Sequence, residues 1–165
     1  MGTQRRPEDR GQRLVRDVLM ALEASTGGDP GRRDLAAEVL GDVLRGAMLD
    51  AATARLVVGR LVALAVGDSV AGVREAALNA LCEASSRYSL PWELVEPLDA
   101  AMARLEPELI TYVLCVFGAT HDLRARPLIE PFLRHPHPDV REEARLADAE
   151  ITMSNTPGGA SPGSA

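Results

Sequence analysis

Three histidines are the side chains of this sequence best suited to holding a metal ion. His135 and His137 flank Pro136, and His121 lies upstream. Helical metal sites usually place two histidines four residues apart, and zinc sites in loops combine histidines with cysteines. The His-Pro-His spacing offers neither arrangement, because no cysteine lies nearby in the sequence. We therefore predict no metal site and no bound cofactor, with a metal in this turn as the alternative interpretation.

The residues that commonly carry catalysis are sparse or unsuitably placed. All 18 basic residues are arginine, so Schiff-base catalysis and a lysine-dependent phosphate loop are impossible. Cys82 and Cys115 each lie in an apolar helical pattern, which favours buried thiols that act as small hydrophobic groups in a reduced, cytoplasmic protein. A disulfide or a catalytic thiol is the alternative. We predict no catalytic residue and a protein that is not an enzyme.

The overall charge is acidic, with a formal net charge of −6 and a pI near 5.1. This balance opposes nucleic-acid binding, because neutralising phosphates normally requires a basic surface. A local basic cluster near the amino terminus is the exception, and we expect it to be a solvated start and helix face. Its members are Arg5, Arg6, Arg10, Arg13 and Arg16. The exclusive use of arginine is typical of GC-rich bacterial genomes, such as those of actinobacteria.

Composition predicts one helical domain. Apolar residues make up 46% of the 165 residues but aromatic residues only 3%, so leucine, valine and alanine must build the core. Such a composition favours close-packed helices over sheets. The most apolar stretch, Leu56 to Val66, contains Arg60, and we expect no membrane span.

Turn residues and apolar periodicity predict eight helices. They run from Pro7 to Ala24, Pro30 to Ala47, Asp50 to Gly67, Val70 to Arg87, Pro91 to Leu105, Pro107 to Ala119, Leu123 to Arg134 and Pro138 to Ile151. Pro97 should delay or kink the fifth helix. The sixth is apolar on nearly every side, which indicates a central position. The helical domain spans residues 7–151, and residues 152–165, rich in Gly, Pro and Ser, should form a disordered tail.

One spaced pattern occurs four times in the chain. An arginine is followed by small or branched apolar residues three and six positions later, and its place is held by Arg33, Arg74, Ile110 and Arg141, which are 41, 36 and 31 residues apart. Such a period fits one helix pair per repeat. The segments Val73-Arg74-x-x-Ala77 and Asp139-Val140-Arg141-x-x-Ala144 resemble the second helix of HEAT and HEAT-like repeats. The resemblance implies an all-α fold, an α-solenoid of about four antiparallel helix pairs.

In the HEAT family, the arginine of this pattern commonly reaches an aspartate near the preceding turn. The resemblance therefore implies a structural ladder of Arg33, Arg74 and Arg141. Arg33 would meet Asp29, Arg74 would meet Asp68, and Arg141 would meet Asp139 or a carboxylate of a neighbouring repeat. Ile110 interrupts the ladder.

HEAT-like stacks usually line a concave surface with their second helices, so the polar positions of those helices are the candidate partner-binding residues. They are Asp34, Glu38, Asp42, Glu75, Asn79, Glu83, Glu142, Glu143, Arg145 and Asp148. Carboxylates dominate this set, which predicts a negative groove that attracts a basic protein. Solubility alone could also explain a Glu-rich face. Tyr88 and Trp92 favour packing at a repeat junction, with a role as binding anchors if they are exposed.

The resemblance extends to function only in general terms, because the family consists mostly of binding scaffolds with a few enzymes. It implies a non-catalytic protein–protein interaction module, either an adaptor or a protein similar to bacterial immunity proteins and antitoxins. The alternative is a HEAT-like enzyme such as a DNA glycosylase. That activity would require a basic concave face and an aromatic pocket, and this acidic sequence has few rings.

Overall fold

The computed structural model describes residues 7–24, 26, 28–46 and 49–157. In this part of the chain every regular element is a helix and no strand occurs, so the predicted all-helical fold class is confirmed there. The elements are α1 (Pro7–Ala24), α2 (Pro30–Gly46), α3 (Ala51–Gly67), α4 (Ala71–Ser85), α5 (Trp92–Val95), η1 (Glu96–Leu98), α6 (Asp99–Met102), α7 (Pro107–Ala119), η2 (Leu123–Ala125), α8 (Arg126–Ile129), η3 (Glu130–Arg134) and α9 (Pro138–Asn155).

Local sequence accounts for the helix boundaries. The Asp50 carboxylate caps α3 by accepting a hydrogen bond from the Thr53 backbone N–H at 2.9 Å, which satisfies one unpaired donor of the first turn. Pro107 and Pro138 open α7 and α9, where the missing N–H is not needed. α9 ends at Asn155, four residues beyond the predicted Ile151. The rest of the predicted disordered tail, residues 158–165, lies outside the residues that the structure describes.

Two predicted helices are built from shorter pieces. The segment from Trp92 to Met102 changes from α-helix to 3₁₀ at Glu96–Leu98 and back again. Pro97 lies in this 3₁₀ turn. Its ring lacks a backbone N–H and crowds the preceding turn, which explains why the α-helix is interrupted here. The predicted disturbance at Pro97 thus takes the form of a 3₁₀ interruption, and the helix does not start late. The segment from Leu123 to Arg134 likewise alternates 3₁₀ and α-helix, with Pro127 in α8 and Pro131 in η3.

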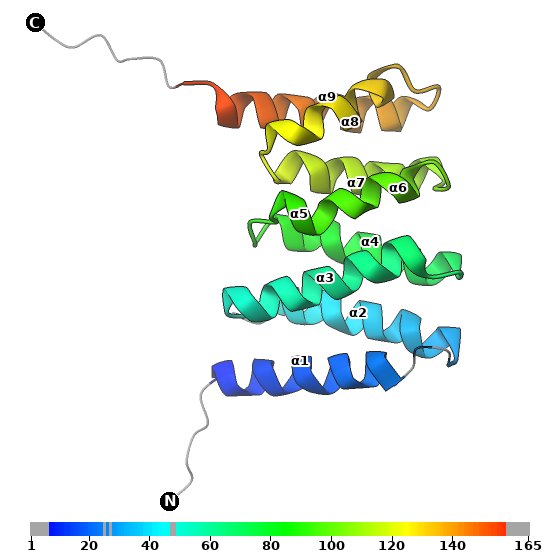
Figure 1. Ribbon diagram of the computed structural model, residues 1–165, viewed down its shortest axis with the longest axis vertical. Coiled ribbons are helices and arrows are strands. Elements are labelled where there is room, and N and C mark those ends of the chain that lie inside the picture. The colour runs from blue at the N-terminus through cyan, green and yellow to red at the C-terminus, as the bar shows by residue number, and fades with distance from the viewer. Residues whose placement is uncertain (1–6, 25, 27, 47–48, 158–165) are drawn as a thin grey trace, which may run out of the picture.

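The helices form an elongated stack of two layers (Figure 1). α2, α4, α7 and α9 make one layer, in which each helix packs directly on the next. α3, the α5–η1–α6 segment and the η2–α8–η3 segment lie in front of them in Figure 1. Within this order α1 packs on α2, α3 on α4, and η3 on α9. The turns that join such partners, around residues 28, 68, 105 and 136, all lie at one end of the layers.

α7 lies in the interior of the stack, between α4 and α9. Its side chains Leu114, Val116 and Phe117 are completely buried, which confirms the predicted central position. The Trp92 ring packs against Phe117 at 5.2 Å between centroids and is only 4% exposed. Trp92 is thus a packing residue, as predicted.

Glycines permit the closest helix contacts of the layer. A Cβ added at Gly41 in α2 would lie 2.9 Å from Cβ of Ala80 in α4. One added at Gly118 in α7 would lie 2.8 Å from Cα of Ala147 in α9. Both glycines come eight residues after the arginine position of the repeated pattern, and both alanines come six residues after it. The repeated pattern therefore sets the same contact at two junctions.

Candidate functional site

An acidic groove lies over α2 and α4. It is an open pocket of about 610 Å³, and six of the predicted partner-binding residues line it. We use "acidic groove" for these six, which are Asp34, Glu38, Asp42, Glu75, Asn79 and Glu83. The structure therefore brings together side chains from two helices that are about forty residues apart in the sequence.

Helix geometry explains how the six side chains come to share one surface. Asp34, Glu38 and Asp42 repeat every four residues along α2, and the three residues of α4 repeat in the same way. Residues four apart lie on the same side of a helix. The close contact between Gly41 and Ala80 then sets the two rows side by side. The floor between them is made by the small residues Gly41, Ala76 and Ala80.

The charge in the groove is only partly neutralised. Its lining holds five carboxylates and one guanidinium, that of Arg45. Arg45 pairs with Asp42, and its Nε lies 3.2 Å from Oε2 of Glu83. The hydrogen bond that Arg45 donates to Asp42, together with the charge of Glu83, raises the pKa of Arg45. Within the described residues, Asp34, Glu38 and Glu75 have no ion-pair partner, so three carboxylates of the lining are unpaired.

Two lining residues were missed by sequence reasoning. Arg45 lies one turn after Asp42 on α2, and its i, i+3 spacing from Asp42 was an available signal. Tyr112 belongs to α7, which the sequence places in the core, yet its side chain is half-buried and reaches the groove. Periodicity could not reveal Tyr112, since the helix is apolar on nearly every side and the next residue, Val113, is completely buried.

The predicted residues of α9 lie outside this groove. Glu142 and Arg145 are exposed and pair with each other, with Oε2 and Nη1 at 3.2 Å. Asp148 accepts a hydrogen bond at 2.7 Å from Nε of Arg126, which belongs to α8. Glu143 is half-buried, and its pKa is raised first by burial and then by the charges of Glu150 and Glu142. None of these α9 residues lines the acidic groove, and a wall of carboxylates that continues onto α9 stays a prediction.

The predicted arginine ladder takes a different form in the structure. Arg33 pairs with Asp68 of the following helix pair, with Nε and Oδ2 at 2.6 Å, and not with Asp29. The Asp29 carboxylate instead accepts the Gly31 backbone N–H at 3.0 Å. The predicted pair of Arg33 with Asp29 is therefore wrong. Asp68 lies within reach of Arg33, and its carboxylate, only 4% exposed, is the partner that Arg33 contacts.

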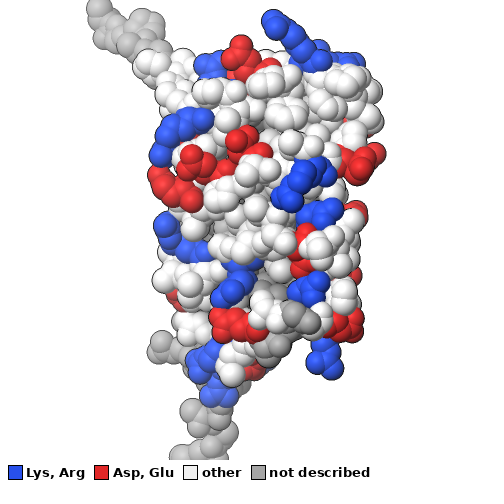
Figure 2. Space-filling model, turned by 45° about the vertical axis from the view of Figure 1, so that its right-hand side comes forward, with Lys and Arg blue, Asp and Glu red and all other residues white. Residues whose placement is uncertain are grey.

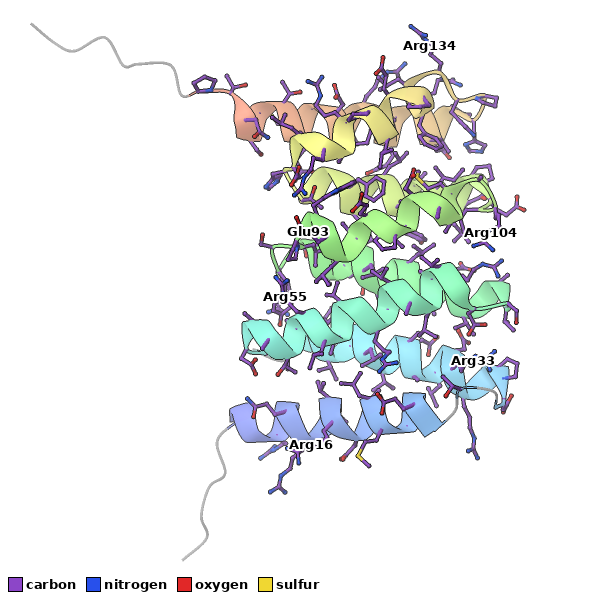
Figure 3. The ribbon with its side chains drawn as sticks, viewed as in Figure 1. Arg16, Arg33, Arg55, Glu93, Arg104 and Arg134 are labelled. Atoms are coloured by element: carbon purple, nitrogen blue, oxygen red, sulfur yellow. The ribbon has the colours of Figure 1, made fainter. Side chains whose placement is uncertain are left out.

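What the three pattern arginines share is a contact with backbone carbonyls of the preceding turn. Arg33 donates to Gly28 O at 2.6 Å, and Arg74 donates to Asp68 O at 2.9 Å. Arg141 donates to the carbonyls of residues 135 and 136, both at 2.8 Å. Arg141 forms no ion pair in the described chain, so the predicted carboxylate partner is wrong. Each arginine thus closes a turn at the same end of the stack, where Figure 3 labels Arg33 and also Arg104.

The histidines have contacts that do not require a metal. His121 Nε2 lies 2.9 Å from Oε1 of Glu150, and the His135 ring stacks on Phe132 with centroids 6.0 Å apart. His135 Nδ1 accepts the backbone N–H of His137 at 3.2 Å. Among the described residues, no group of three His, Cys, Asp or Glu side chains is arranged to hold a metal ion.

The two cysteines differ from the sequence prediction. Cys82 on α4 and Cys115 on α7, two helices in contact, are half-buried and not fully enclosed. Their Sγ atoms are 2.8 Å apart. They are therefore neighbours and not two separate small core groups.

The amino-terminal basic cluster is partly visible. Arg10, Arg13 and Arg16 of α1 are exposed, and Figure 3 shows Arg16 pointing away from the stack. Arg5 and Arg6 lie outside the described residues. Figure 2 shows a face on which basic and acidic side chains alternate, without a continuous area of either sign. A basic surface able to follow a nucleic acid is not apparent on that face.

Comparison of the chain with protein-family models, with curated proteins and with solved structures found no match. None of the described helices combines the length and apolar character needed to cross a membrane. The functional interpretation therefore depends on the site itself.

Proposed function

We propose that the protein is a non-catalytic binding module, that its helix pairs form a HEAT-like α-solenoid, and that its acidic groove binds a basic segment of another protein. The observation that carries this proposal is the unpaired charge of Asp34, Glu38 and Glu75 at the mouth of one open pocket. The immunity-protein and adaptor roles expected from the sequence both require such a surface.

The shape of the groove supports an extended or helical ligand. Eight residues separate Asp34 from Asp42, a rise of about 12 Å along the α2 axis. A second row runs along α4, so a ligand lying between the helices meets carboxylates on both sides. Arginine side chains suit this arrangement, because a guanidinium can donate two parallel hydrogen bonds to one carboxylate.

Electrostatics supports a basic partner over a neutral one. Like charges held close together raise the local potential, and a partner of opposite sign is attracted before contact. Burying a neutral segment here would desolvate carboxylates without giving them partners, which is costly. Arg45 already neutralises the end of the groove near Glu83, so the open end near Asp34 and Glu38 should bind most of the incoming charge.

Binding of an oligo-arginine peptide, followed by fluorescence anisotropy at about 0.1 M ionic strength, tests the proposal. The double variant Glu38→Gln, Glu75→Gln should weaken binding by about 0.2–1 kcal/mol per carboxylate, or roughly two- to thirtyfold in all. The matched control is Glu96→Gln, Glu130→Gln, which removes the same charge from exposed positions outside the groove.

The control should change binding by less than the groove variant, and so should Glu142→Gln, whose carboxylate is already paired with Arg145. Equal weakening by all three variants would show that the peptide senses net charge alone. The acidic residues would then serve solubility, and the proposed groove would be wrong.

A further inference from the structure

The contact between Cys82 and Cys115 is a second site on the same layer. Cys82 lies on α4 and Cys115 on α7, two helices that pack directly on each other. Their Sγ atoms are 2.8 Å apart, less than 1 Å beyond the length of an S–S bond, about 2.05 Å. Both side chains are half-buried, so a small reagent in solution has access to them.

The repeated pattern shows that this contact replaces another kind of packing. Cys82 comes eight residues after Arg74, the position that Gly41 and Gly118 hold in their own helices. At those two junctions a glycine lies against an alanine. At the α4–α7 junction the same position carries a thiol, and its neighbour is a second thiol. Two reactive groups therefore meet where the other junctions use the smallest residues.

The surroundings make the two thiols unequal. The hydrogen bond from the Cys82 thiol lowers the pKa of Cys115, and the Ser85 hydroxyl acts in the same direction, against burial and the charges of Glu143 and Glu150. The same hydrogen bond, with burial and the charges of Cys115, Glu143 and Glu83, raises the pKa of Cys82. The thiolate is the reactive form, so Cys115 is the attacking sulfur.

We propose that Cys82 and Cys115 form a reversible intramolecular disulfide between α4 and α7, with a low-molecular-weight disulfide such as oxidised glutathione as the oxidant. The Cys115 thiolate attacks one sulfur of glutathione disulfide, forms a mixed disulfide and releases one glutathione thiolate. Cys82 then loses its proton to solvent and attacks Sγ of Cys115, which releases the second glutathione thiolate. The two cysteines are oxidised and one glutathione disulfide is reduced to two thiols.

This bond would tie the end of the acidic groove to the middle of the stack. Glu83, next to Cys82, and Tyr112, one turn before Cys115, both line the groove. The disulfide would fix the two helices that carry them relative to each other. The proposal itself does not depend on ligand binding in the groove, and its test contains no binding partner.

The test exposes the full-length protein to oxidised glutathione and counts free thiols by maleimide labelling and mass spectrometry. We expect both thiols to disappear together, leaving a monomer that carries no glutathione and whose mass is lower by two hydrogens. Dithiothreitol should restore both thiols. The variants Cys82→Ser and Cys115→Ser should each stop at a glutathione adduct on the remaining cysteine, with wild-type circular dichroism.

Three results would overturn the proposal. One is a wild-type protein that keeps a glutathione adduct on one cysteine while the other stays free. The second is a disulfide between two protein chains, and the third is the survival of both thiols in excess oxidant.

Discussion

The α2–α4 and α7–α9 surfaces have the same packing but differ in how far their carboxylates are paired. In both, a glycine of one helix lies against an alanine of the next, at equivalent positions of the repeated pattern. Over α2 and α4 the polar residues gather into a pocket with three unpaired carboxylates. On α9, Glu142 is paired with Arg145, Asp148 with Arg126, and Glu143 is half-buried.

The difference shows that the repeated residues and the surface residues have separate roles. The pattern positions fix how closely two helices approach, and they are alike at both ends of the layer. The charge of each surface depends on the positions between them, which the pattern leaves variable. A binding site can therefore occur on one helix pair and be absent from an equivalent one.

The strongest test of the shared packing is a large side chain at the third position after the pattern arginine. Ala77 and Ala144 hold this position in α4 and α9, and both are completely buried. Changing either to leucine should lower the free energy of unfolding by about 1–3 kcal/mol, because the core must expand to accept it. Urea unfolding measures the loss. A variant with unchanged stability would mean that the two ends are not packed alike.

A smaller loss should follow from adding one methyl group at the close contacts. Gly118→Ala would bring Cβ to 2.8 Å from the Ala147 backbone, and we expect a loss of about 1–2 kcal/mol. Gly41→Ala meets a side-chain methyl instead and should cost less. Gly59→Ala is the control, since nothing lies within 4 Å of the added Cβ. That variant should gain up to about 1 kcal/mol from helix propensity.

The smallest effect concerns the turn contacts, which differ between the two ends. Burial opposes ionisation of Asp68, but hydrogen bonds from Arg33 and the Val70 N–H, with the charges of Arg33 and Arg74, lower its pKa overall. Its stabilising effect is therefore present above the unfolded-state pKa, about 3.9, and is lost as the pH falls through the folded-state value. Among the described residues, the side-chain partners of Arg141 are the backbone carbonyls of residues 135 and 136.

Asp68→Asn should accordingly lower stability by about 1 kcal/mol at neutral pH and flatten the acid limb of the stability curve. Thermal unfolding of the wild type and the variant at a series of pH values, from well below to well above the unfolded-state pKa of Asp68, would measure both effects. Asp139→Asn, at the corresponding turn of α9, should leave that limb unchanged. An equally steep acid limb in Asp68→Asn would show that the Arg33–Asp68 pair contributes nothing.

Much of the fold could be predicted because its signals are local. Pro107 and the apolar run after it define α7, and Pro97 marks the 3₁₀ interruption, since both act within one turn of the chain. The end of α9 was misjudged at Ile151, because Thr152, Ser154 and Asn155 are weak helix formers. In the structure, Thr152 and Ser154 hydroxyls and the Asn155 amide bond to carbonyls four residues earlier.

The site could be predicted only where spacing along one helix determines it. The four-residue repeats placed Asp34, Glu38 and Asp42 on one side of α2, and the structure agrees. Pairing across helices needs distances that the sequence does not contain. This is why Arg33 was assigned to Asp29 and not to Asp68, why Asp148 was placed in the groove, and why Tyr112 was overlooked.

A nuclear magnetic resonance titration of the labelled protein with the oligo-arginine peptide tests the central claim most directly, because it locates binding residue by residue. We predict that backbone amide shifts concentrate in residues 34–45 of α2 and 72–83 of α4, and that α9 changes little. Shifts of similar size around Glu142 and Arg145, or spread evenly over the exposed carboxylates, would contradict a binding site confined to the acidic groove.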